Sequence, residues 1–162
     1  MSLEEFNAAP DEAVTATLLA CCDVPSWAAA VRAGRPYADV EAALRMADDA
    51  ARTLGPDDVE RALAAHPRIG ERAEGGGRGA AWSRQEQSGV ADETRQALQE
   101  GNRAYEDRFG RVFLICATGL DGEQMLRALR ERLGHDDATE AAVVADELRK
   151  IALLRLHKAL ES

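Results

Sequence analysis

Along most of this chain, apolar residues recur every three to four positions, which is the spacing of one face of an α-helix. Interrupted by proline and glycine, this pattern predicts helices over residues 10–21, 26–34, 38–53, 57–65, 83–107, 122–133 and 138–160. We expect residues 111–117, which are mostly apolar, to be extended. Since no repeat or linker divides the sequence, it predicts a single domain over residues 1–162, an all-α bundle of about seven to eight helices.

One glycine-rich segment stands between the predicted helices. Residues 70–81 contain Gly75, Gly76, Gly77 and Gly79, and a helix disfavours such a run. The segment is either a solvated connector or a lid over a binding site, and its composition fits both.

The composition agrees with an all-helical fold. Hydrophobic residues make up 46% of the chain but aromatic residues only 4%, and alanine supplies much of the difference. Such a sequence favours closely packed helices over sheet. No run reaches the length of about 18 apolar residues that a membrane span needs, so we expect no membrane association.

The negative net charge argues against a nucleic-acid partner. The chain carries 29 acidic and 20 basic residues, a net charge of −9, and shows no basic stripe for nucleic acid. An anionic substrate would therefore have to be held by local arginines. The acidic N-terminus lacks the pattern of a signal peptide and the C-terminus lacks a peroxisomal address, so we expect a cytoplasmic protein.

Cysteine and histidine spacing argues against a disulfide framework and against a zinc site. The three cysteines are expected to be reduced and buried. The three histidines show none of the spacings typical of zinc ligands, so we expect no metal.

His66 and Pro67 form the first candidate site. Proline disfavours the α conformation at the residue before it, so the helix over 57–65 must end here and leave His66 at its C-terminus. The helix dipole stabilises the cationic imidazole there, which suits a general acid. A histidine that only caps the helix would show the same pattern.

The segment from Ser83 to Gln87 is the second candidate. Ser83 and Glu86 have the spacing of a capping box, which would make Ser83 the start of a helix. Capping does not explain Gln87, which lies with them on the apolar face of that helix. A polar ligand bound at the helix N-terminus would satisfy these groups.

Arg155 is the third candidate. It lies within about 20° of Val144 on the stripe that Val144, Leu148 and Ile151 define in the last predicted helix. A buried guanidinium needs an anionic partner. That partner is either an internal carboxylate, such as Glu86, or a carboxylate or carbonyl oxygen of a substrate.

Several motifs follow one another along the chain: His66-Pro67-Arg68-Ile69-Gly70-Glu71, Ser83-x-x-Glu86-Gln87, Asn102-x-x-Tyr105-x-x-x-Phe109-Gly110, Phe113-Leu114-Ile115-Cys116-Ala117 and Leu154-Arg155-Leu156. In this order and spacing they resemble the OHCU decarboxylase family. OHCU is 2-oxo-4-hydroxy-4-carboxy-5-ureidoimidazoline, an unstable intermediate of urate degradation. The resemblance covers essentially the whole chain.

The resemblance implies an all-helical, cofactor-free carboxy-lyase that converts OHCU to (S)-allantoin. It implies that His66 is the general acid and that Glu86 orients His66 and the substrate. It also implies a homodimer. The substrate-binding residues that it implies are Pro67, Ser83, Arg84, Gln85, Glu86, Gln87, the backbone of Phe113, Leu114, Ile115, Cys116 and Ala117, and Arg155.

Two other classes of function remain open from the residues. A non-catalytic helical module that binds a ureide or another small anion would keep Arg155 and Gln87 but would tolerate the loss of His66. A metal-dependent hydrolase could use His66 and Glu86, but the sequence offers no second and third ligands.

Overall fold

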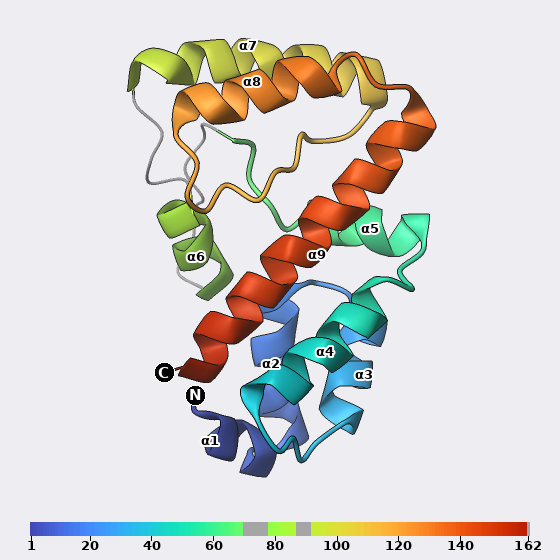
Figure 1. The fold of residues 1–162 in the computed structure, drawn as a ribbon, viewed down its shortest axis with the longest axis vertical. Helices are drawn as coiled ribbons and strands as arrows, with labels where there is room; N and C mark the ends of the chain where they lie inside the picture. Colours follow the sequence, from blue (N-terminus) through green and yellow to red (C-terminus); the bar gives the residue numbers. More distant parts are fainter. Residues whose placement is uncertain (70–77, 87–91, 162) are drawn as a thin grey trace. The chain divides into compact units, whose positions relative to one another are not determined.

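Helices are the dominant elements of the computed structural model, which describes residues 1–69, 78–86 and 92–161 (Figure 1). Over these residues there are nine helices and no strand, which confirms the all-α prediction. They are α1 (Leu3–Ala8), α2 (Asp11–Cys21), α3 (Pro25–Ala33), α4 (Val40–Ala51), α5 (Pro56–Leu63), α6 (Arg78–Glu86), α7 (Asp92–Phe109), α8 (Gly122–Arg132) and α9 (Asp137–Glu161).

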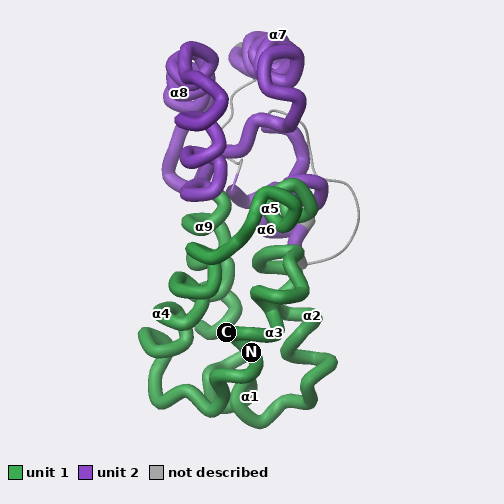
Figure 2. The backbone as a smooth tube through the Cα atoms, turned by 90° about the vertical axis from the view of Figure 1, so that its right-hand side faces the viewer, with its two compact units in different colours: residues 1–62, 148–162 green, residues 63–147 purple. Residues whose placement is uncertain are grey.

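The chain forms two compact units, which Figure 2 shows in green and purple. Unit 1 comprises residues 1–62 and 148–162, and unit 2 comprises residues 63–147. The first contains α1 to α4, most of α5 and the C-terminal part of α9. The second contains α6, α7, α8 and the first turns of α9. A single domain over residues 1–162 remains a prediction.

Unit 1 is built around Trp27 and Phe6, which are both buried. The Trp27 indole on α3 donates to the Ala47 carbonyl on α4 over 2.9 Å, so the largest side chain of this core is also satisfied as a donor. Arg35 follows α3 and donates to the carbonyls of Phe6 and Ala9, each over 2.9 Å, at the end of α1. These contacts use the carbonyl groups that a helix end leaves without partners.

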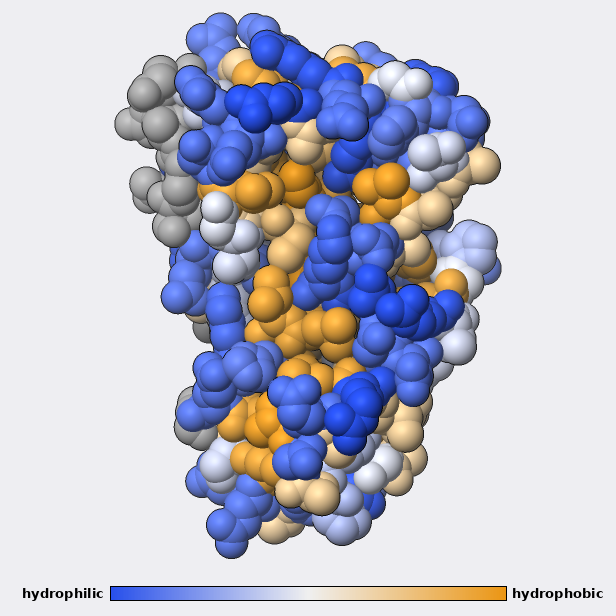
Figure 3. Space-filling model, in the orientation of Figure 1, coloured by the Kyte–Doolittle hydropathy of each residue, from blue (hydrophilic) through white to orange (hydrophobic). Residues whose placement is uncertain are grey.

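In unit 2 the helices α7 and α8 run in the same direction, joined by a non-helical segment that returns beneath them (Figure 1). Gly122 of α8 meets Thr94 of α7, and two turns further along both helices Leu129 meets Gly101. A Cβ atom on Gly101 would lie 2.8 Å from Leu129, so glycine permits the close approach of the two helices. Hydrophilic side chains dominate the outer face of this pair in Figure 3.

Beneath α7 and α8 lies one buried apolar cluster. It takes residues from both helices, from the end of the segment that follows α5, and from the return segment. Its members are Ile69, Leu98, Tyr105, Phe113, Ile115, Ala117, Met125 and Leu129. Residues 112–117 form no helix, as predicted, and alternate members of the segment enter this core.

A buried ion pair connects α8 and α9 in the same unit. Glu140 of α9 is 0% exposed and accepts from Arg132 of α8 over 2.6 Å and from the Tyr105 hydroxyl of α7, also over 2.6 Å. Burial raises the pKa of Glu140, but hydrogen bonds from Arg132 and Tyr105 outweigh it and hold that pKa below its usual value. Burial and the Glu140 carboxylate together raise the pKa of Tyr105 to about 12, so the phenol remains a donor.

The predicted capping box at Ser83 is wrong. Helix α6 begins at Arg78, which places Ser83 inside the helix rather than at its start. Ala80 and Ala81 are strong helix formers and outweigh the cost of Gly79. Residues 78–81 of the predicted glycine-rich segment are therefore helical, and its positions 70–77 lie outside the described residues.

Capping boxes occur elsewhere in the chain. Ser2 and Glu5 form one at the start of α1, a helix that the periodicity did not predict. Asp121 and Gln124 form another at the start of α8. The predicted helix over 83–107 is two helices, α6 and α7, with residues 87–91 outside the described part of the chain.

No helix in the described ranges combines the length and the apolar character that crossing a membrane requires.

We expect Glu140→Gln to lower the free energy of unfolding by about 3–5 kcal/mol, because Arg132 would stay buried without a charged partner. Since folding lowers the pKa of Glu140, its contribution is present above the unfolded value of about 4.3 and is lost as the pH falls through the lower folded value. Urea unfolding followed by circular dichroism at several pH values measures this difference.

The control is Glu131→Gln, which removes an exposed carboxylate from α8 and should change stability by no more than about 0.5 kcal/mol. A cost at Glu140 as small as that at Glu131, or one that grows on acidification, would contradict the assignment.

Candidate functional site

The candidate general acid lies just after the end of α5. The helix ends at Leu63, ahead of Pro67 as predicted, and the His66 amide donates to the Leu63 carbonyl over 3.0 Å. His66 and Pro67 are both half-buried. The imidazole is therefore placed where water and a small ligand can reach it without full exposure, which suits proton transfer.

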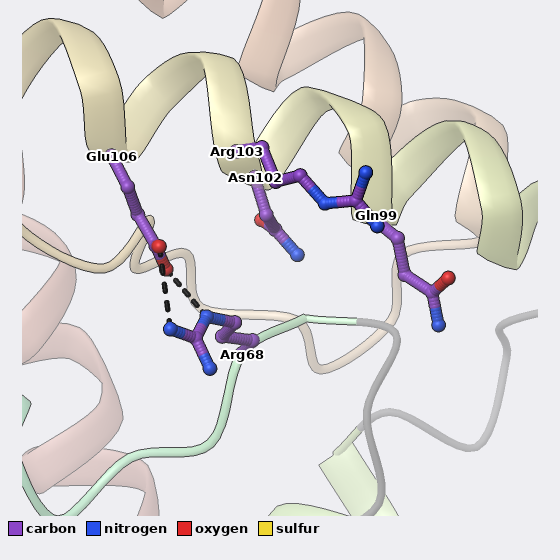
Figure 4. A pocket seen from close by; sticks show the side chains of 5 residues that line it. All are labelled: Arg68, Gln99, Asn102, Arg103 and Glu106. Carbon is purple, nitrogen blue, oxygen red and sulfur yellow. Dashed lines mark hydrogen bonds and ion pairs between the residues drawn. The ribbon is translucent and has the colours of Figure 1, made fainter.

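Helix α7 holds the residues that follow His66. The Asn102 side chain donates from Nδ2 to the Ile69 carbonyl over 2.7 Å. One turn along the helix, Glu106 accepts from Arg68 Nε over 2.5 Å and from Nη2 over 3.3 Å (Figure 4). The sequence revealed Asn102 only as part of a motif, because a partner more than 30 residues away leaves no local signal.

These side chains line a polar cavity of about 360 Å³, together with Gln99 and Arg103. Figure 4 shows Asn102 and Glu106 directed from α7 toward the segment that carries Arg68. Asn102 is only 2% exposed, and its Oδ1 has no hydrogen-bond partner within the described part of the chain.

Backbone groups of the return segment, which the sequence suggested for binding a ligand, contact side chains of the protein. Phe113, Ile115 and Ala117 lie in the buried cluster, and the intervening residues use their backbone groups. Arg132 donates to the Leu114 carbonyl over 2.7 Å, and the Cys116 amide donates to Glu147 Oε1 over 3.3 Å. Two backbone groups that the sequence suggested for a ligand are thus already engaged by side chains of α8 and α9.

The candidate residues of α6 differ in their exposure to solvent. Ser83 is buried and Glu86 is half-buried, and their spacing of three places them on one side of the helix. Arg84 and Gln85 are exposed, so they are the weaker candidates for substrate binding. Gln87 lies outside the described residues. The predicted pairing of Glu86 with His66 stays a prediction.

In unit 1, Arg155 is buried as the helical pattern predicted, at 4% exposure, on the same stripe of α9 as Leu148 and Ile151. Its Nη1 donates to the Ala20 carbonyl over 3.1 Å at the end of α2. Burial raises the pKa of the neighbouring Cys22 to about 12, with Asp23 adding to the rise and Arg155 opposing it. The Cys22 thiol is therefore protonated and does not neutralise the guanidinium.

Unit 2 brings two of the predicted site segments onto one core. Ile69, at the end of the His66 segment, and Phe113, Ile115 and Ala117 of the return segment belong to the same buried cluster. Within the described ranges, no group of three or more histidine, cysteine, aspartate or glutamate residues could hold a metal ion.

Comparison with solved structures identifies the class of fold. A crystal structure of OHCU decarboxylase in the presence of (S)-allantoin superposes with a TM-score of 0.77 at 28% identity, covering 95% of this chain and 100% of the other. The crystal structure of (S)-allantoin synthase shares the fold, with a TM-score of 0.72 over 98% of this chain and 54% of that one, at 18% identity. The fold is that of a helical decarboxylase.

Sequence comparison identifies the family. The OHCU decarboxylase family model matches residues 7–157. The chain is 34% identical over 147 residues to 2-oxo-4-hydroxy-4-carboxy-5-ureidoimidazoline decarboxylase of Amia calva, covering 85% of this chain and 81% of that protein. It is 26% identical over 168 residues to the enzyme of the same name from Haloferax volcanii, covering 100% and 98%. This chain belongs to the OHCU decarboxylase family.

Proposed function

We propose that this protein is a carboxy-lyase of urate catabolism that decarboxylates OHCU to (S)-allantoin without a cofactor. The family match over residues 7–157 is the observation that carries this proposal. The half-buried His66, held between the end of α5 and the contacts of α7, supplies an acid in a defined position.

The substrate itself provides the electron sink for this reaction. When the carboxylate leaves as CO₂, the electron pair of the broken C–C bond moves into the ring imine of OHCU. The enzyme must orient the carboxylate before it departs and then deliver a proton to one face of the planar intermediate. His66 is the residue that we propose for this proton transfer, with Pro67 restricting the backbone beside it.

The other predicted residues would bind and orient the substrate. We propose that Glu86 stabilises the protonated imidazole and that Ser83, on the same face of α6, contacts the substrate. Since the Leu114 carbonyl and the Cys116 amide are already engaged within the protein, we propose the other backbone groups of residues 113–117 as ligands for the ring and the ureido group. Arg155 would bind an anionic or carbonyl oxygen of the substrate.

Two further properties are proposed, a cytoplasmic location expected from the sequence and a homodimer implied by the family resemblance. The protein would act in the cytoplasm and form a homodimer, and sedimentation of the purified chain reports the second directly.

Replacing His66 by alanine should lower the rate of enzymatic OHCU consumption by about 10²–10⁴-fold, because a positioned acid contributes that much to a proton-transfer step. OHCU is generated in place from urate with urate oxidase and the hydrolase that follows it, and its decay is measured by absorbance. EDTA should leave the wild-type rate unchanged.

The matched control is His157→Ala, which removes an exposed histidine of α9 and should keep the wild-type rate. If wild-type protein binds OHCU but leaves its spontaneous decay unchanged, the chain is a ureide-binding module. Loss of activity with EDTA would instead support the metal-dependent reading.

Glu86→Gln should lower the apparent pKa of His66, because a carboxylate that favours the cationic imidazole is removed. In the pH dependence of kcat/KM, the limb that reports His66 should therefore move to lower pH. The conservative variant Glu86→Asp keeps the charge and should shift the limb less. A profile for Glu86→Gln that coincides with the wild-type profile would argue against the pairing.

A further inference from the structure

Two side chains of α7 bind the residues that follow His66 along the chain. Asn102 binds the carbonyl of Ile69, and Glu106 binds the guanidinium of Arg68. The two are four residues apart, so they project from the same face of the helix, toward the segment that Figure 4 shows below it.

The Asn102 contact replaces a missing backbone hydrogen bond. Residues 67–69 belong to no helix, and Ile69 is buried, so its carbonyl needs a partner from elsewhere. The amide nitrogen of Asn102 supplies that partner at 2.7 Å, and the opposite amide orientation would bring two oxygen atoms together. The contact therefore fixes both the carbonyl and the side chain.

Glu106 adds a second hold on the neighbouring residue. Its two carboxylate oxygens accept hydrogen bonds from Nε and Nη2 of Arg68. This two-point contact restricts the guanidinium in direction as well as in distance. At the other end of the segment, the His66 amide is bound to the Leu63 carbonyl at the end of α5. His66 thus lies between two fixed points, and the ring of Pro67 removes one of the backbone rotations between them.

We propose that Asn102 and Glu106 are positioning residues for the reaction, acting through residues 68 and 69 on the direction of the His66 imidazole. This inference rests on the proposed function, since it assumes that His66 donates the proton. A general acid acts in the transition state, so its misplacement lowers kcat more than it raises KM. A displacement of about 1 Å can lower the rate by about 10²-fold.

The first test is Asn102→Ala, compared with Gln96→Ala. Gln96 is an exposed amide side chain of the same helix, which makes it a matched control. We expect kcat to fall by about 10- to 100-fold in Asn102→Ala with KM little changed, and both constants to stay at wild-type values in Gln96→Ala. Folding of each variant is checked by circular dichroism below its unfolding temperature.

The second test exchanges the charges of the partly exposed ion pair. Arg68→Glu and Glu106→Arg should each lower kcat, and the double exchange should restore part of the loss because the contact is rebuilt with reversed polarity. This test does not depend on the buried amide, so it remains informative if Asn102→Ala fails to fold. Folded single variants that keep the wild-type kcat, or a double exchange no better than the singles, would overturn the proposal.

Hydrogen exchange separates this proposal from the proposed function. Loss of the Asn102 contact should speed exchange of the His66 amide, which is protected by the Leu63 carbonyl, whether or not the protein is an enzyme. An inactive wild-type protein would refute the decarboxylase function. Unchanged exchange at His66 in Asn102→Ala would refute the positioning role.

Discussion

The ion pair between Arg132 and Glu140 is the interaction on which unit 2 depends. It is buried from water, so its charges are acceptable only because each is matched: the carboxylate by the guanidinium and the Tyr105 hydroxyl, and the guanidinium by the carboxylate and the Leu114 carbonyl. Tyr105 and Phe113 pack beside the same guanidinium. The pair thus joins α7, α8, α9 and the return segment at one point.

This arrangement explains how a helical protein can hold its candidate site residues on non-helical backbone. Residues 66–69 and 112–117 make no helix or sheet that would fix them, so side chains from the surrounding helices satisfy their carbonyl and amide groups. The side chains of Ile69, Phe113 and Ile115 are buried in one shared cluster. Rigid helices and anchored segments together give the preorganisation that the reaction proposed above, without a cofactor, would need.

The sequence predicted those parts of the structure that depend on local spacing. Proline placed the end of α5 before His66, and the 3.6-residue period placed Arg155 in the buried stripe of α9. Local spacing was misleading at Ser83, where a capping-box pattern falls inside α6. The contacts of Asn102 with Ile69 and of Arg132 with Glu140 and Leu114 could not be predicted, because they depend on how the helices pack.

The optical activity of the product reports whether a positioned acid protonates the intermediate on one face. OHCU is generated in place, and the circular dichroism signal of allantoin is followed with and without the protein. We expect a rapid rise of the (S) enantiomer in the presence of the protein. Racemic allantoin that forms at the rate of the protein-free control would contradict it.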